Sequence, residues 1–547
     1  MNIKKLKNIK RDWNKWSVTT LIIISFIAIP ILTIFFRLFY GPGETWDHIV
    51  KNLLLDYSLN SLFLINGCTI LTLAFGVSSA WIVSRYSIPF QKYLEWMLIL
   101  PLTIPSYITA YAYAGFFDYG GSLELLLESV GISGVKLNIT NIFGLIFILS
   151  VSLFPYVYVS ARAVFLFQSG RLIEASKNLG VGERKTFFKI VLPIARPAII
   201  GGLILVLMEV LNDYGAAKYF GVNTFTTGIF RSWFSLEEPA TAVYLAAILL
   251  VIVFAIIYFE KLQRRNKNYA ITTKSDIKTP KINLRKRTRF VLSAIVCIPV
   301  FFGFILPFLQ LVYWSFLTYT EVASASFFTI ALQSLGISLL AAFLTVFIAI
   351  ILIYVPRWNR ISWLKNSSSI AIIGYAIPGA VIAIGIMIPT LQLDKWLIST
   401  IKELFDTNVG LIINGTIIVL LYAYIIRFLA VAYNPIEASQ LKIGKSLSES
   451  SKLLGKGNLY TFFKIDFPLL KVGLLSAFIL VFVDVMKELP LTLILKPYDI
   501  NTLAVKSYEY ASDELIMEAS LPSLCIIFTG IIPIILLNKL ILNNDKK

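Results

Sequence analysis

The sequence predicts an all-α, polytopic membrane protein with about 12 transmembrane helices in two parallel six-helix repeats. The 547 residues are 57% hydrophobic and only 15% charged, whereas a soluble protein carries about 25% charged residues. Apolar runs of roughly 20 residues recur along the chain, and a helix of that length crosses a bilayer core of roughly 30 Å. The second half of the chain also resembles the first, which predicts the duplication.

Twelve apolar runs account for the predicted helices in order. The third run is interrupted by Pro101 and Pro105, which a membrane helix tolerates because neighbouring groups can satisfy the freed carbonyls. The fifth and eleventh runs each follow a proline. The runs are 18–40, 59–84, 94–116, 142–167, 195–214, 241–261, 289–316, 331–355, 368–391, 410–435, 470–487 and 517–541.

The distribution of basic residues predicts the orientation. The stretch before the first run carries six Lys and Arg, and Lys261–Arg289 carries eleven. Cytoplasmic segments of membrane proteins are enriched in Lys and Arg, so we expect both termini and the linker 263–287 in the cytoplasm. The net charge of +18 therefore reports topology and does not indicate a nucleic-acid partner. We expect the basic linker to contact anionic lipid headgroups.

Few residues could support catalysis or hold a metal. His48 is the only histidine, and Cys68, Cys297 and Cys525 are scattered singly. No nucleophile stands near a base in the sequence, and no spacing is typical of a metal site. The sequence therefore predicts neither an enzyme nor a metal site.

The internal repeat is strongest in two polar stretches. EASKNLGVGERKTFFKIVLP begins at residue 174 and ESSKLLGKGNLYTFFKIDFP begins 275 residues later. IPSYITAYAYAGFF at 104 likewise resembles IPGAVIAIGIMIP at 377. We predict a first repeat over 1–262 and a second over 288–547, separated by the linker. Because each repeat has an even number of helices, the chain returns to the side on which it started, and both repeats have the same orientation in the membrane. In duplications of this kind the substrate path tends to lie at the interface between the repeats.

Each polar stretch contains a carboxylate, small residues, a glycine, two phenylalanines and a proline at matching positions. Small residues allow close approach to another backbone, and glycine allows a turn that strains other residues. The two phenylalanines give the next segment an apolar side that we expect to enter a groove on a partner. Proline suits the first turn of the membrane helix that follows. The residues are Glu174, Ala175, Gly180, Phe187, Phe188 and Pro193 in loop 1 (174–193), and Glu449, Ser450, Gly455, Phe462, Phe463 and Pro468 in loop 2 (449–468).

These two stretches resemble the EAA loop of binding-protein-dependent ABC importer permeases, and the match occurs twice at the same spacing. The resemblance implies the type I ABC importer permease fold in a bacterial cytoplasmic (inner) membrane. It also implies two copies of a cytoplasmic ATPase, each contacted by one loop through Glu174 or Glu449, and an extracytoplasmic substrate-binding protein. ATP and Mg²⁺ would be bound by the ATPase, because the GKS at 444 lacks the earlier glycine of a phosphate-binding loop, where Ser439 stands.

Ionisable residues follow each loop near the end of the next apolar run. Glu209 and Asp213 are four residues apart, as are Asp484 and Glu488, so we expect a helix to place each pair on one face, and Lys487 lies beside the second pair. Charges in membrane segments usually face a bundle interior or a water-filled path. Two readings stay open: the acidic pairs line a cation path, or they are interfacial charges paired near helix ends, with Lys487 neutralising a carboxylate.

A narrower resemblance concerns the substrate. VMKELPLTLILKPYDINTLA and LNDYGAAKYFGVNTFTTGIFRSWF resemble the matching segments of ferric-iron importer permeases, with Lys496 where arginine is usual. The resemblance implies ferric iron as substrate and places Lys487 and Glu488 near the outer mouth of the path. Fused permeases for thiamine or phosphonate compounds share the layout and are the alternative. A secondary transporter is a distant alternative, because it has no use for two matched loops.

Overall fold

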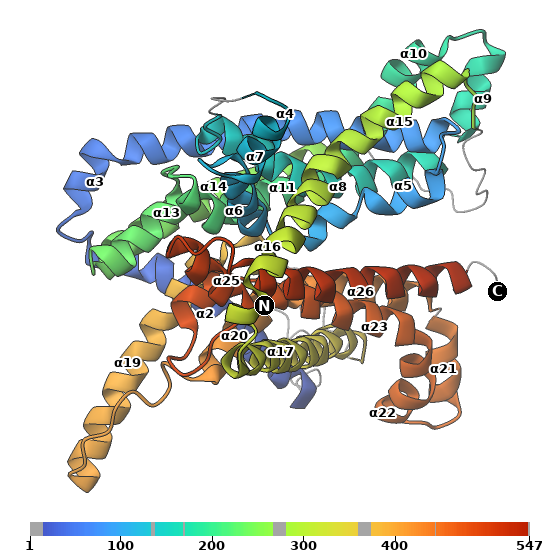
Figure 1. Cartoon of the computed structure of the whole chain (residues 1–547). Coiled ribbons are helices and arrows are strands. Elements are labelled where there is room, and N and C mark those ends of the chain that lie inside the picture. The colour runs from blue at the N-terminus through green and yellow to red at the C-terminus, as the bar shows by residue number, and fades with distance from the viewer. Residues whose placement is uncertain are drawn as a thin grey trace. The chain divides into compact units, whose positions relative to one another are not determined.

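The computed structural model describes residues 15–132, 137–167, 170–265, 281–358, 374–443 and 445–544, and these residues are almost entirely helical (Figure 1). Extended pairing among them is limited to one parallel bridge between Tyr86 and Ile282. The N-terminal basic stretch up to residue 14, residues 266–280 of the predicted linker, and Gly444 of the GKS sequence lie outside the described residues.

The described helices agree with the predicted membrane spans. Ten of them are long and apolar enough to cross a membrane, so the chain is a multi-pass membrane protein. The pair Gln91–Thr103 and Ser106–Ser129 is bent by 92° where Pro101 and Pro105 interrupt the run, and it makes an eleventh span if the two helices cross the membrane together. The twelfth predicted run corresponds to the shorter apolar stretch Ser520–Ile532. Residues 368–373 of the predicted run 368–391 lie outside the described residues, and a helix that starts at Gly379 after Pro378 covers the later part of the run and continues to Phe405.

The described helices form two compact units, and neither unit coincides with one repeat. Unit 2 comprises residues 43–323 and 507–527, and unit 1 comprises the remainder. The helices of unit 2 are α3 (Trp46–Asn52), α4 (Leu54–Arg85), α5 (Gln91–Met97), η2 (Leu100–Thr103), α6 (Ser106–Phe117), α7 (Ser122–Ser129), α8 (Ile142–Phe167), α9 (Gly170–Asn178), α10 (Glu183–Thr186), η3 (Phe187–Val191), α11 (Leu192–Asn212), α12 (Gly215–Tyr219), α13 (Phe225–Phe230), η4 (Arg231–Ser235), α14 (Pro239–Arg265), α15 (Lys286–Val300), η5 (Phe301–Ile305) and α16 (Leu306–Val322).

Unit 1 contains the equivalent helices of the second repeat together with the N-terminal helix. Two helices, α25 and α26, contribute residues to both units. The helices are α2 (Lys15–Arg37), η1 (Leu38–Tyr40), α17 (Ala325–Trp358), α19 (Gly379–Phe405), α20 (Ile417–Lys442), α21 (Lys445–Leu453), α22 (Asn458–Thr461), η6 (Phe462–Asp466), α23 (Phe467–Met486), α24 (Pro490–Leu495), α25 (Leu503–Ser512) and α26 (Ser520–Asn544).

The first helix of the chain packs in unit 1, against helices of the second repeat. Pro30 lies within α2 and has no N–H, so the carbonyl of Phe26 loses its usual helical donor. The hydroxyl of Tyr422 in α20 donates to that carbonyl at 2.5 Å. Gly385 of α19 lies against the backbone of Pro30, and a Cβ there would stand 2.5 Å from the Pro30 carbonyl oxygen. Both contacts depend on the proline and the glycine that the sequence supplies.

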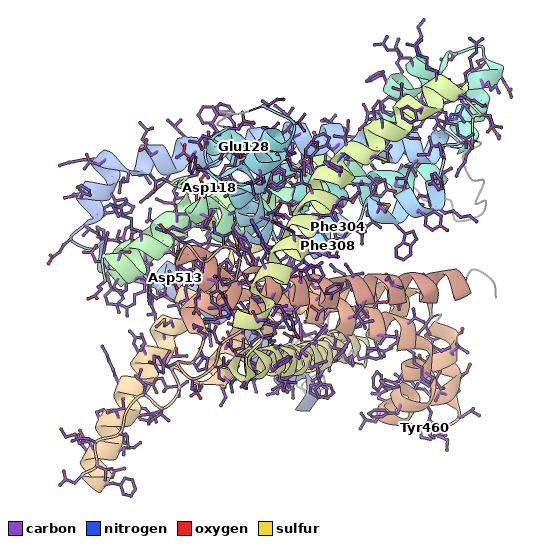
Figure 2. The ribbon with its side chains drawn as sticks, viewed as in Figure 1. Asp118, Glu128, Phe304, Phe308, Tyr460 and Asp513 are labelled. Atoms are coloured by element: carbon purple, nitrogen blue, oxygen red, sulfur yellow. The ribbon has the colours of Figure 1, made fainter. Side chains whose placement is uncertain are left out.

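The first helix of the second repeat packs in unit 2 in the same way. The continuous helix α15–η5–α16 contains a π-turn at Phe301–Ile305, followed by Pro307. A π-turn pairs residues five apart, so Pro307 leaves the carbonyl of Phe302 without that donor, and the hydroxyl of Tyr113 donates to it at 2.6 Å. Figure 2 labels Phe304 and Phe308 of this helix, whose rings stack 5.3 Å apart. The two repeats have therefore exchanged their first helices.

Equivalent elements of the two repeats begin and end at matching residues. The helices α6 and α19 each begin after an extended proline, Pro105 or Pro378. The long helices α11 and α23 each end at a break, and a short helix, α12 or α24, follows. These two helix breaks, at Asp213 and at Lys487–Glu488, carry the ionisable residues that the sequence singles out.

Candidate functional site

Loop 1 is a short helical hairpin before α11. Glu174 and Ala175 are exposed on α9, and Ser176 beside them is buried. The backbone of Gly180 has φ +71°, in the left-handed region that favours glycine, so the chain turns there into α10. A π-turn at Phe187–Val191 then leads into α11, with Pro193 in its first turn. The arrangement presents Glu174 on an exposed helix.

The two phenylalanines of loop 1 point to different surroundings. The ring of Phe187 lies 4.8 Å from that of Trp81 in α4 and 6.2 Å from that of Phe165 in α8. Phe188 is 57% exposed. Phe187 therefore anchors the loop on its own bundle, and Phe188 is the member of the pair that a partner protein can reach.

An ion pair also holds loop 1 to the end of α4. Arg85 is only 2% exposed, and its guanidinium forms two hydrogen bonds with the carboxylate of Glu183, the first residue of α10. A bidentate arginine–carboxylate pair fixes orientation as well as distance. The linker also contacts the end of α4. The N–H of Ile282 donates to the carbonyl of Arg85 at 2.9 Å, and the carbonyl of Ile282 accepts from the N–H of Ser87 at 3.0 Å.

Loop 2 has the same geometry. Glu449 and Ser450 are exposed on α21, Gly455 has φ +73°, and a π-turn at Phe462–Asp466 precedes Pro468. The ring of Phe462 packs 4.8 Å from that of Tyr354, whereas Phe463 is 61% exposed. Figure 2 labels Tyr460 on this hairpin, where its side chain is 48% exposed.

The interiors of the two loops differ in polarity. The hydroxyl of Ser448, the residue before loop 2, donates to the buried carboxylate of Asp466 at 3.1 Å. The matching residues of the first repeat are Ile173, just before loop 1, and Val191, which are both buried. Asn458 stands where loop 1 has Glu183, so loop 2 has no carboxylate at that position. The two loops thus keep the same backbone while differing in what anchors them.

At the first helix break, Asp213 caps the following helix. Asp213 is 9% exposed, and its carboxylate accepts the N–H groups of Ala216 (2.9 Å) and Ala217 (3.2 Å). It also accepts the hydroxyl of Ser106, the first residue of α6. Because α11 ends at Asn212 and Asp213 has extended ψ, Glu209 and Asp213 do not lie on one helix. Glu209 remains on α11 and is partly exposed.

At the second break, Glu488 takes the position of Asp213. Its carboxylate accepts the N–H of Leu491 at 3.1 Å and lies 3.9 Å from the guanidinium of Arg427 in α20. Arg427 also donates to the carbonyl of Ile377. Both charged side chains are buried, at 4% and 7% exposure, so each neutralises the other in a region that excludes water.

The remaining two predicted path residues form a pair of their own. The ammonium of Lys487 lies 2.8 Å from the carboxylate of Asp484, and the side chains are 25% and 19% exposed. The two acidic residues of each predicted pair are therefore separated in role, with Asp213 and Glu488 buried at the breaks and Glu209 and Asp484 on the preceding helices.

Sequence reasoning missed Arg85, Arg427 and a group of tyrosines that includes Tyr214 and Tyr508. Each arginine occurs alone within or at the end of an apolar run, which is a signal because an isolated charge there needs a partner. The tyrosines gave no comparable signal, since aromatic residues are common in membrane helices. Within the residues that the structure describes, no group of three His, Cys, Asp or Glu side chains is arranged to hold a metal.

Comparison with known proteins defines the class of this protein. The family model described as "Binding-protein-dependent transport system inner membrane component" matches residues 72–268 and 358–543. The two matches cover most of the chain and fall one in each repeat. The chain therefore belongs to this family of transport permeases.

Several curated relatives are similar over nearly the whole chain. The Fe(3+)-transport system permease protein FbpB 2 of Haemophilus influenzae is 26% identical over 96% of this chain and 98% of its own length. The ferric transport system permease protein FbpB of Actinobacillus pleuropneumoniae is 23% identical over 85% of this chain and 69% of its own. The spermidine/putrescine permease PotB of Haemophilus influenzae is 27% identical but covers 32% of this chain.

Proposed function

We propose that this chain is the permease of an ATP-driven importer for ferric iron. The substrate assignment rests on how much of this chain is similar to permeases named for iron. The iron permease of Haemophilus influenzae matches 96% of the chain, whereas relatives named for sulfate, spermidine/putrescine and molybdenum match between 28% and 41% of it. The relatives named for ferric transport match 85% to 96% of the chain, so their matches take in both repeats.

In this proposal the two loops couple the permease to a separate ATPase. Exposed Glu174 and Glu449 stand on short helices held by Phe187 and Phe462. A rigidly seated helix with an exposed carboxylate suits docking to a basic residue of a partner. Each of two ATPase copies would bind one loop, and ATP and Mg²⁺ would be bound there and not by this chain.

The transport cycle follows from this division of parts. ATP binding would draw the ATPases together and move both loops, because α10–η3–α11 and α22–η6–α23 connect each loop directly to a membrane helix. The motion would reach the breaks at Asp213 and Glu488, where the helices already end and can change direction. An extracytoplasmic binding protein would deliver the iron, and both termini would lie in the cytoplasm of a bacterial cell whose inner membrane holds the complex.

Uptake of radiolabelled ferric iron tests the proposed substrate. Cells with and without this gene would be compared under iron limitation, in a strain with no second iron system, with excess unlabelled thiamine as competitor. We expect uptake that requires the gene and ignores thiamine. Uptake that is unchanged by deletion would refute the iron assignment, and gene-dependent uptake of labelled thiamine would establish the alternative.

A further inference from the structure

Four tyrosines of unit 2 form a row where α6, α12 and α25 meet. The phenolic oxygens of Tyr214 and Tyr508 are 3.4 Å apart, and their rings are 5.9 Å apart. The rings of Tyr111 and Tyr219 are 6.3 Å apart. We call Tyr111, Tyr214, Tyr219 and Tyr508 the tyrosine row. Tyr508 comes from the second repeat and the other three from the first, so the row crosses between the repeats.

Further oxygen atoms connect the members of the row. The hydroxyl of Tyr111 is hydrogen-bonded to those of Ser507 and Ser523, which are 2.8 Å from each other. Ser507 precedes Tyr508 in α25, and the carboxylate of Asp213 belongs to the residue before Tyr214. Two groups of oxygen atoms, one around Tyr111 and one at Tyr214 and Tyr508, are therefore carried by neighbouring residues of α25.

Carboxylates lie at the Tyr219 end of the row. Burial, followed by the negative charges of Asp118 and Glu514, raises the pKa of the Tyr219 phenol to about 12, so both carboxylates are close enough to act on it. Asp118 follows α6, and Asp513 and Glu514 follow α25. Figure 2 labels Asp118 and Asp513 on these two segments. A cation that approaches the row at this end meets negative charge.

The second repeat supplies an internal control for the packing role of these tyrosines. At the positions that match Tyr111, Tyr214 and Tyr219, the second repeat has Ile384, Leu489 and Ile494. These aliphatic residues are as deeply buried, at 0%, 1% and 7% exposure. The same helices and the same break therefore form without phenols. The hydroxyl groups on the first-repeat copy are not required by the fold.

We propose that the tyrosine row lines the translocation path and passes a hard trivalent cation from one oxygen donor to the next. The proposal rests on the proposed function and adds the residues that contact the cargo. Hard cations prefer anionic and neutral oxygen ligands. A phenol that coordinates the cation releases its proton to water and regains one when the cation leaves. Transport requires several weak sites and not one tight site.

The spacing of Tyr214 and Tyr508 suits this role. Two oxygens bound at right angles to one cation, with bonds of about 2.05 Å, lie roughly 2.9 Å apart. The observed 3.4 Å is closed by a small movement of either ring. The fully buried contacts of Tyr111 with Ser507 and Ser523 close the row in this conformation, so the path must open there when cargo passes.

The double variant Tyr214→Phe with Tyr508→Phe tests the proposal, because it removes both phenolic oxygens and keeps both rings. Tyr158→Phe is the matched control, since Tyr158 is a buried tyrosine of α8 whose hydroxyl donates to the carbonyl of Glu95. Ferric uptake would be measured in cells that express the complete importer, with the amount of permease in the membrane determined for each variant. Terbium(III) luminescence sensitised by tyrosine would report direct binding to the purified full chain.

We expect the double variant to lose at least tenfold in uptake and most of the terbium signal, while Tyr158→Phe retains both. If the double variant takes up ferric iron at the wild-type rate, the proposed role of the tyrosine row is wrong, and the proposed function is unaffected. If the wild-type chain itself does not support iron uptake, the proposed function is wrong, and so is the proposed role of the tyrosine row, which depends on it. An unchanged terbium signal in the double variant would also overturn the assignment, because the two phenols would then not contact the cation.

Discussion

Asp213 and Glu488 occupy the corresponding breaks of the two repeats, and each accepts hydrogen bonds from the backbone of the short helix that follows, from Ala216 and Ala217 for Asp213 and from Leu491 for Glu488. The two carboxylates satisfy donors at a buried helix start, which would otherwise cost free energy. They differ in their other partner, a serine hydroxyl for Asp213 and an arginine for Glu488. The breaks that interrupt the membrane helices are thus built twice, with different electrostatics.

The capping role of Asp213 predicts a difference between two substitutions. Asp213→Ala leaves the N–H groups of Ala216 and Ala217 without their acceptor and should lower the free energy of unfolding by about 1–2 kcal/mol. Asp213→Asn keeps an acceptor oxygen and should lose much less. Thermal unfolding of the purified permease in detergent checks this, and equal destabilisation by both variants would show that the charge matters and the cap does not.

The two phenylalanines of loop 1 should respond oppositely to truncation. Phe187→Ala removes a ring that packs on Trp81 and should destabilise the chain by roughly 3 kcal/mol. Phe188→Ala removes an exposed ring and should change stability by less than about 0.5 kcal/mol, while ATP-driven uptake falls. Unfolding and uptake would be measured for both. Full uptake by a stable Phe188→Ala variant would exclude this ring from the contact with the ATPase.

Charge reversal on both loops tests the coupling role. Glu174→Arg combined with Glu449→Arg should abolish ATP-driven uptake, because two like charges would then face each other at each ATPase contact. The permease should still reach the membrane in normal amount, since both side chains are exposed. Glu128→Arg, also at an exposed glutamate, is the matched control. Normal uptake by the double variant would exclude the two carboxylates from coupling.

Glu238 gives a prediction for pH. Burial opposes ionisation, but hydrogen bonds from Thr241, Thr45 and the backbone of Glu44 outweigh it, and the pKa of Glu238 lies below its ordinary value of 4.5. The ionised form is therefore stabilised by folding, so this contribution is complete above pH 4.5 and is lost as the pH falls through the folded pKa. Wild type and Glu238→Gln should differ in thermal stability at pH 7 and converge at lower pH. A difference that does not change with pH would contradict the assignment.

The sequence predicts the repeat, the spans and the two loops because their causes are local. Gly180 and Gly455 stand where the backbone turns, and Pro193 and Pro468 stand where long helices begin. The break after Asn212 was not predicted, since Asp213 continues a helical spacing and its hydrogen bonds to α12 and Ser106 are tertiary. The inward direction of Phe187 was likewise beyond prediction, because a Phe-Phe pair does not reveal which ring meets Trp81.

The exchanged first helices have a consequence for the synthesis of the protein. The helix α2 is made first, yet Gly385 and Tyr422, which it contacts, emerge hundreds of residues later, and unit 2 is completed only by residues 507–527. At roughly 5–20 residues per second, the ribosome needs tens of seconds to deliver those contacts. The early helices must therefore wait in the bilayer with unfilled surfaces, and neither half of the chain, if translated alone, would assemble a finished bundle.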